Sequence, residues 1–141
     1  MTSRAPLPTV RILLVDDSPW QREGWAVLLG SQPDLEIVGQ AGDGKQALQF
    51  LRRNAVDVVL MDIQMPRVNG VTATERVLSD DRVREQGRPP RIVLVTSFDL
   101  DEHVPAAAQV GAYAVLYKDA EPETLFEVGR EAAAARDGLT S

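Results

Sequence analysis

The sequence predicts an α/β domain in which a doubly wound, five-stranded parallel sheet is flanked by five helices. Three observations support this fold class. Five short apolar runs rich in Val, Ile and Leu recur along the chain, helix-like stretches lie between them, and 141 residues suffice for one core but not for two. Strands that alternate with crossover helices form a parallel sheet wound right-handedly, so helices are expected on both of its faces.

The five apolar runs are the predicted strands. The first and the fourth are nearly continuous, which is typical of parallel strands buried on both faces. With crossover helices between them, the strands favour the flavodoxin-like order 2-1-3-4-5. In chain order they are Val10 to Val15, Leu35 to Val38, Val56 to Met61, Ile92 to Val95 and Ala112 to Tyr117.

Capping signals and a 3.6-residue apolar period mark the predicted helices. Ser18-Pro19 opens the first helix and Asp43 can cap the second. The third covers Thr72 to Leu78, the fourth Glu102 to Val110, and the fifth runs from Glu121-Pro122 to about Asp137, where Gly138 stops it. A basic cluster between the third helix and the fourth strand is interpreted as a solvated loop; it consists of Arg82, Arg84, Arg88 and Arg91.

The composition excludes several classes of protein. The absence of cysteine rules out disulfides and thiolate metal sites, and a single histidine, His103, disfavours a histidine metal cluster. A net charge of −6 disfavours a nucleic-acid surface. No apolar run approaches the roughly 20 residues that span a bilayer, and residues 1–8 lack the apolar segment of a signal peptide. We therefore expect a cytoplasmic protein without membrane contact.

Polar residues follow four of the predicted strands and should meet at one edge of the sheet, because ligands bind at the carboxyl ends of parallel strands. Three crowded carboxylates repel one another, and such a cluster raises its pKa values or recruits a cation. Oxygen ligands favour Mg²⁺, and Mg²⁺ would leave one carboxylate able to attack phosphorus. A lysine and a hydroxyl could then stabilise the phosphoryl oxygens. The residues are Asp16 and Asp17, Asp62, Thr96 and Ser97, and Lys118.

Four segments at these strand ends resemble the receiver domains of two-component response regulators. They are LLVDDS (13–18), VVLMDIQMPRVNG (58–70), LVTSF (94–98) and VGAYAVLYKDA (110–120). The segments SFDLDEHV (97–104) and LYKDAEPETL (116–125) are similar to the NarL/FixJ, LuxR-type subfamily, whose members usually carry a C-terminal DNA-binding domain. The resemblance covers about residues 10–137, which are the predicted receiver domain. Residues 1–9 are expected to be a flexible tail, and 138–141 the end of the domain or the start of a linker.

The resemblance also implies roles for single residues. Asp62 matches the phosphoacceptor, and Asp16, Asp17, Asp62 and the backbone carbonyl of Gln64 match the Mg²⁺ ligands. Thr96 and Lys118 match the groups that contact the phosphoryl oxygens, and Pro66 and Gly70 match the turn after the acceptor. The implied donor is a sensor histidine kinase. The resemblance implies a switch rather than an enzyme. The domain would catalyse its own phosphorylation and dephosphorylation and so control transcription. A homodimer is also implied, because receivers of this kind often pair.

Two positions differ from the commonest receiver pattern. Asp119 stands where many receivers have a proline after the lysine, and Val115 stands where many have an aromatic residue. Val115 cannot fill or vacate the same space, so the route by which Thr96 signals to the output surface is open. Tyr113 and Tyr117 should share a strand face with Val115, because side chains alternate with a period of two. Phe98 and Gln64 would overhang the pocket and set water access.

The sequence leaves three alternative functions open. A receiver-like module could act without phosphorylation. A P-loop nucleotidase is suggested by Gly39, Gly44 and Lys45 but lacks the hydroxyl residue after the lysine, where Gln46 stands. A haloacid-dehalogenase-like phosphatase would need Asp-x-Asp after its first strand, whereas Asp16 and Asp17 are adjacent.

Overall fold

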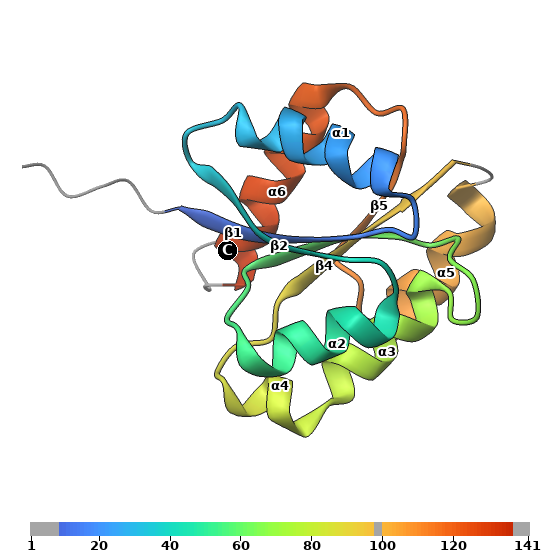
Figure 1. The fold of residues 1–141 in the computed structure, drawn as a ribbon. Helices are drawn as coiled ribbons and strands as arrows, with labels where there is room; N and C mark the ends of the chain where they lie inside the picture. The colour runs from blue at the N-terminus through green and yellow to red at the C-terminus, as the bar shows by residue number, and fades with distance from the viewer. Residues whose placement is uncertain (1–8, 98–99, 137–141) are drawn as a thin grey trace, which may run out of the picture.

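A parallel sheet lies between two layers of helices in the computed structural model, which describes residues 9–97 and 100–136 (Figure 1). The strands are β1 (Val10–Val15), β2 (Leu35–Ala41), β3 (Val58–Asp62), β4 (Arg91–Thr96) and β5 (Ala114–Tyr117). Their order is β2-β1-β3-β4-β5 with every pairing parallel. The predicted fold class and strand order are therefore confirmed.

Helices cover both faces of this sheet. Helices α1 (Pro19–Gly30) and α6 (Pro122–Arg136) lie on one face, and α2 (Gly44–Arg53), α3 (Gly70–Ser79), α4 (Asp81–Glu85) and α5 (Leu100–Val110) lie on the other (Figure 1). None of the helices in the described ranges combines the length and apolar character that crossing a bilayer requires.

Each strand feeds two separate cores because its side chains alternate between the faces. In β1, Leu13 and Val15 pack under α2 and α3, whereas Ile12 and Leu14 pack under α1 and α6. All four are at most 2% exposed, so the nearly continuous apolar run is explained by burial on both sides.

The predicted starts of the first two helices are confirmed by their caps, whereas the third and fourth helices begin two residues earlier than predicted, at Gly70 and Leu100. The Ser18 hydroxyl accepts a hydrogen bond from the Gln21 N–H, and the Asp43 carboxylate accepts one from the Gln46 N–H. Both caps leave the following helix starting at the sheet's carboxyl end, beside the polar residues that follow the strands.

The prediction of five helices and a solvated basic loop was wrong in one segment. Asp80 caps a short helix, α4, by accepting from the Val83 N–H, and Val83 is buried. Five residues are too few to show a helical period, so only the capping residue signalled it. Arg91 is the first residue of β4 rather than a loop residue.

Candidate phosphoryl-acceptor site

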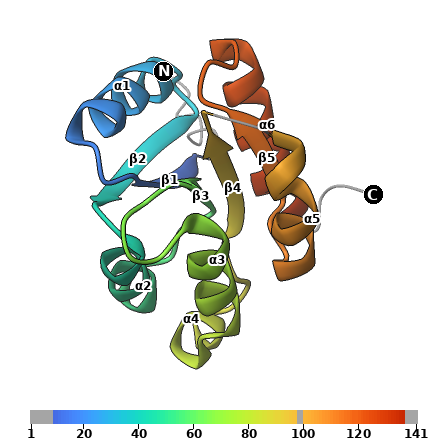
Figure 2. The same cartoon turned by 90° about the vertical axis from the view of Figure 1, so that its right-hand side faces the viewer.

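The strand register brings the predicted site residues together at the carboxyl end of the sheet, which faces the viewer in Figure 2. Val15 pairs with Met61, so Asp16, directly after β1, stands beside Asp62, the last residue of β3. Asp62 pairs with Val95, and Thr96 pairs with Tyr117, so the last residue of β4 and Lys118 follow on the other side. The Lys118 N–H donates to the Thr96 carbonyl at 2.9 Å.

A three-carboxylate cluster forms around one lysine. Carboxylate oxygens of Asp16, Asp17 and Asp62 all lie within 4.8 Å of one another. The Lys118 Nζ lies 3.4 Å from Asp62 Oδ2 and 3.6 Å from Asp16 Oδ2. Asp16 and Asp62 are 0% and 1% exposed, whereas Asp17 is exposed, so the cluster opens to solvent on the Asp17 side.

The buried carboxylates are only partly satisfied. Oδ1 of Asp16 accepts from the Ser18 N–H at 2.8 Å, and Oδ1 of Asp62 accepts from the Gln64 N–H at 3.1 Å. Oδ2 of Asp16 is buried and accepts no hydrogen bond from any residue that the structure describes. Such an orphaned carboxylate oxygen beside two further carboxylates fits a hard cation such as Mg²⁺.

Burial raises the pKa of both inner carboxyl groups above the usual range. For Asp16, desolvation outweighs the Ser18 hydrogen bond and Lys118, which lower the pKa, and the neighbouring Asp17 raises it further. For Asp62, desolvation again dominates, and the Asp16 charge adds to it against the Gln64 hydrogen bond and Lys118. One lysine therefore does not compensate the charge gathered in this pocket.

The segment after Asp62 is held close to the strand end. The Gly70 N–H donates to the Ile63 carbonyl at 2.8 Å, and a Cβ at Gly70 would lie 2.5 Å from the Asp62 carbonyl oxygen. Between them, the Val68 N–H donates to the Pro66 carbonyl across Arg67, whose φ is +69°. This is a γ-turn with a left-handed centre, and such strain gathers at functional segments.

The structure corrects one expectation about β5. Val115 packs with the core under α2 and α3, but Tyr113 packs with the opposite core and lies under the Arg91 guanidinium, 5.9 Å from the ring centre. Tyr113 precedes the first residue of β5, so the period of two does not extend to it. Tyr117 is 44% exposed. The predicted overhang of Phe98 lies outside the described residues.

Two contacts at the site were missed by the sequence reasoning. The Ser97 hydroxyl donates to the Gln64 side-chain oxygen at 3.2 Å, joining the segments after β4 and β3. Arg22, on the second turn of α1, donates to the Asp16 carbonyl at 2.6 Å. An arginine on an amphipathic helix carries no signal that separates such a contact from a solvated one.

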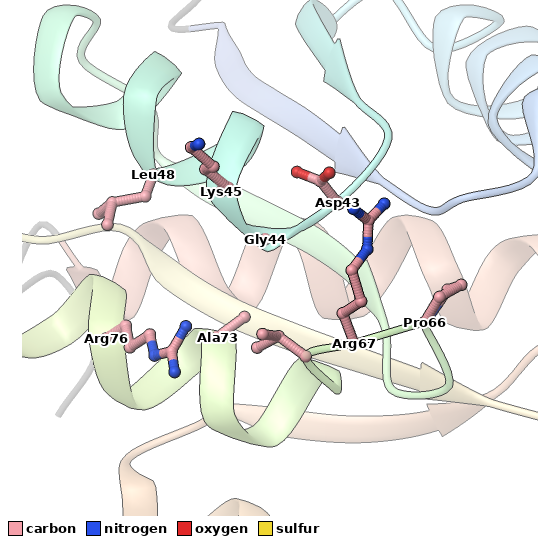
Figure 3. A pocket seen from close by; sticks show the side chains of 9 residues that line it. Asp43, Gly44, Lys45, Leu48, Pro66, Arg67, Ala73 and Arg76 are labelled. Carbon is pink, nitrogen blue, oxygen red and sulfur yellow. The ribbon is translucent and has the colours of Figure 1, made fainter.

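The residues that suggested a P-loop lie elsewhere. Gly44 and Lys45 line a surface cavity of about 280 Å³ between α2, α3 and the turn at Pro66 (Figure 3). Gly39 lies within β2 rather than in a loop, and the Asp43 carboxylate caps the helix start where a phosphate would bind. The geometry therefore opposes nucleotide binding at these residues.

Comparison with known proteins gives one family. Residues 12–129 match the response regulator receiver domain. The chain is 37% identical over 125 residues to the transcriptional regulatory protein YxjL of Bacillus subtilis (strain 168), covering 88% of this chain and 54% of that protein.

Further relatives agree on the domain but differ in what accompanies it. The chain is 37% identical over 115 residues to protein-glutamate methylesterase/protein-glutamine glutaminase 3 of Anaeromyxobacter dehalogenans (strain 2CP-C), covering 80% of this chain and 32% of that protein. The receiver domain of the response regulator NarL from Mycobacterium tuberculosis superposes with a TM-score of 0.78 at 30% identity, over 89% of this chain and 97% of that one. The chain spans about half the length of YxjL, and less of the methylesterase.

Proposed function

The chain belongs to the response regulator receiver domain family, and from this premise we propose that it accepts a phosphoryl group from a sensor histidine kinase onto Asp62. One observation carries the proposal. Asp62 ends a central strand, is buried beside Asp16 and Asp17, and has the Lys118 ammonium 3.4 Å from its Oδ2. A carboxylate flanked by a cation and a metal-binding pair is equipped to attack phosphorus.

The chemistry follows from this arrangement. A carboxylate oxygen of Asp62 forms the new bond to phosphorus while the bond from phosphorus to the donor histidine nitrogen breaks, leaving the imidazole as the leaving group. The Lys118 ammonium and the Thr96 hydroxyl stabilise the phosphoryl oxygens. Asp16, Asp17, Asp62 and the Gln64 carbonyl would hold Mg²⁺, which supplies positive charge to those oxygens. Hydrolysis reverses the modification when water attacks the acyl phosphate.

A labelling experiment tests the acceptor. The chain is incubated with Mg²⁺ and phosphoramidate, and the intact mass is measured. The wild type should gain one phosphoryl group, and Asp62→Asn should gain none. Asp57→Asn is the matched control, because Asp57 lies just before the other end of the same strand, where its carboxylate accepts from the Arg11 N–H. Equal labelling of Asp62→Asn would remove the assignment, and no labelling of the wild type would favour a phosphorylation-independent binding module.

We propose that the kinase docks on the exposed side of α1. Trp20, Val27 and Leu28 are 87%, 67% and 39% exposed and lie on one side of this helix by their spacing. Exposed apolar stripes of this kind mark interaction surfaces. The stripe starts two residues after Ser18, whose N–H donates to Asp16, so a partner covering it would lie against the pocket that must receive the phosphoryl group.

Comparing a phosphorylated kinase with phosphoramidate as phosphoryl donor separates effects on kinase docking from effects on the acceptor chemistry. Trp20→Ala should slow transfer from a phosphorylated kinase that labels the wild type, yet leave labelling by phosphoramidate unchanged. Val104→Ala, on α5 across the sheet and 41% exposed in the wild type, is the control. Equal kinase transfer to the wild type and Trp20→Ala would exclude this docking face.

The output is proposed from the relatives. We propose control of transcription through a C-terminal DNA-binding domain, because YxjL is a transcriptional regulatory protein and this chain spans about half its length. Phosphorylation-linked homodimerisation is part of this proposal. Mass measurements with and without beryllofluoride test it, and an unchanged monomer would remove it.

A further inference from the structure

Arg22 is a contact of the acceptor pocket that the acceptor chemistry leaves unexplained. From α1 it reaches back over the ends of two strands. Its Nη1 donates to the Asp16 carbonyl at 2.6 Å and to the Ala41 carbonyl at 3.5 Å, and its Nε donates to the Gln40 side-chain oxygen at 3.2 Å. The guanidinium therefore ties together α1, the end of β1 and the end of β2.

One side of the guanidinium lies against the loop between β2 and α2. A Cβ at Gly42 would lie 3.3 Å from Arg22 Nη1, which is tighter than most such contacts. The Gly42 N–H itself donates to the Gln46 side-chain oxygen at 2.8 Å, which fixes the loop between β2 and α2. Arg22 is therefore partly exposed, but its guanidinium is held against the backbone at the ends of β1 and β2.

The bond to the Asp16 carbonyl has a specific consequence for the acidic pair. That carbonyl belongs to the peptide unit joining Asp16 to Asp17, so holding it sets the orientation of that unit. On the preceding side, the Asp16 N–H donates to the Ala41 carbonyl at 3.1 Å. Both peptide units around Asp16 are anchored, and this lets two adjacent side chains, one buried and one exposed, direct carboxylate oxygens into one cluster.

We propose that Arg22 is a positioning residue for the Mg²⁺-binding carboxylates, acting through the peptide unit between Asp16 and Asp17. This inference rests on the proposed function. The direction in which Mg²⁺ affinity changes when Arg22 is removed distinguishes positioning from a simple charge effect. A guanidinium near the pocket repels a divalent cation, so its removal would tighten Mg²⁺ binding if charge dominated. If positioning dominates, removal weakens binding, by about tenfold or more for a group that orients a metal ligand.

An NMR-monitored Mg²⁺ titration of the full chain tests the inference. Arg22→Ala should raise the dissociation constant by about tenfold or more, and Arg22→Lys should give a value between those of Arg22→Ala and the wild type, because its ammonium can still donate to one carbonyl. Arg130→Ala is the matched control. Arg130 makes a similar clamp, donating to Asp34 at 2.7 and 2.9 Å and to Gln32 at 2.9 Å, away from the pocket. It should lose stability with unchanged Mg²⁺ affinity.

The outcomes separate this inference from the proposed function. If folded Arg22→Ala binds Mg²⁺ with the wild-type dissociation constant or a lower one, the positioning role is overturned. If Arg22→Ala does not fold, Arg22→Lys decides: weaker binding supports the role, and wild-type affinity overturns it. A wild type that does not bind Mg²⁺ would instead contradict the proposed function itself. A second readout is labelling by phosphoramidate, which in Arg22→Ala should be slow at low Mg²⁺ and restored at saturating Mg²⁺.

Discussion

Aspartates at the two ends of the sheet have opposite pKa shifts because their surroundings differ. At the amino end, the Asp34 carboxylate accepts two hydrogen bonds from Arg130. There too, Oδ2 of Asp80 lies 2.6 Å from Nη2 of Arg52. At the carboxyl end, Asp16 and Asp62 are buried and share one lysine at 3.6 and 3.4 Å. The pKa is lowered for the first pair, mainly by the arginine hydrogen bonds, and raised for the second, mainly by burial.

This contrast separates charge that stabilises the fold from charge that serves a site. The amino-end carboxylates are complemented by the protein's own arginines and need nothing further. The carboxyl-end carboxylates are held in a less favourable state that a cation would relieve. The following predictions measure how far that division of the molecule extends, beginning with the backbone.

The largest expected effect comes from glycines at the two ends. Gly70→Ala should lower the free energy of unfolding by about 2–3 kcal/mol, because its Cβ would overlap the Asp62 carbonyl oxygen. Gly30→Ala, at the last residue of α1, meets nothing within 4 Å and should raise it by about 0.5 kcal/mol. Urea denaturation followed by circular dichroism measures both. Equal stabilities would show that the segment after Asp62 adapts without cost.

The next effect comes from the buried charge itself. Without Mg²⁺, Asp62→Asn should raise the free energy of unfolding at pH 7 by on the order of 2 kcal/mol, because one of two buried like charges is removed. The raised pKa of Asp62 means that the folded state binds more protons than the unfolded state. The contribution of Asp62 to wild-type stability should therefore be lost as pH rises from about 4, the unfolded pKa, through the higher folded pKa.

The difference in the free energy of unfolding between Asp62→Asn and the wild type should accordingly vanish below about pH 4, where the wild-type carboxyl is protonated in both the folded and the unfolded state. Added Mg²⁺ should narrow the difference at pH 7 by stabilising the wild type, by about 1.4 kcal/mol at ten times its dissociation constant. Thermal unfolding across pH, with and without Mg²⁺, makes the measurement. A variant less stable than the wild type at pH 7 without Mg²⁺ would show that Lys118 fully compensates the pocket.

Most of the fold and the inner site followed from sequence because they depend on local patterns repeated along the chain. Apolar runs set the strands, and the residues after them were predicted to meet at one edge, as Asp16, Asp62 and Lys118 do. What escaped prediction depends on contacts between distant segments. Arg22 and α4 carry too little local signal, and Tyr113 lies one residue outside the strand whose period was applied to it.

The smallest effect should have the opposite sign to that of Asp62→Asn. Asp34→Asn should lower the free energy of unfolding at pH 7 by roughly 0.5–1 kcal/mol, because solvent screens the pair and asparagine can still accept from Arg130. The lowered pKa of Asp34 means that its contribution is present above the unfolded pKa of about 4 and is lost as pH falls through the folded pKa. Glu36→Gln, an exposed change on β2, controls for net charge. If Asp34→Asn also stabilised the protein, both results would reflect the net charge of −6, and the division between the two ends would be lost. Opposite signs with a silent control would instead locate the charge imbalance in the pocket, where the proposed phosphoryl chemistry needs it.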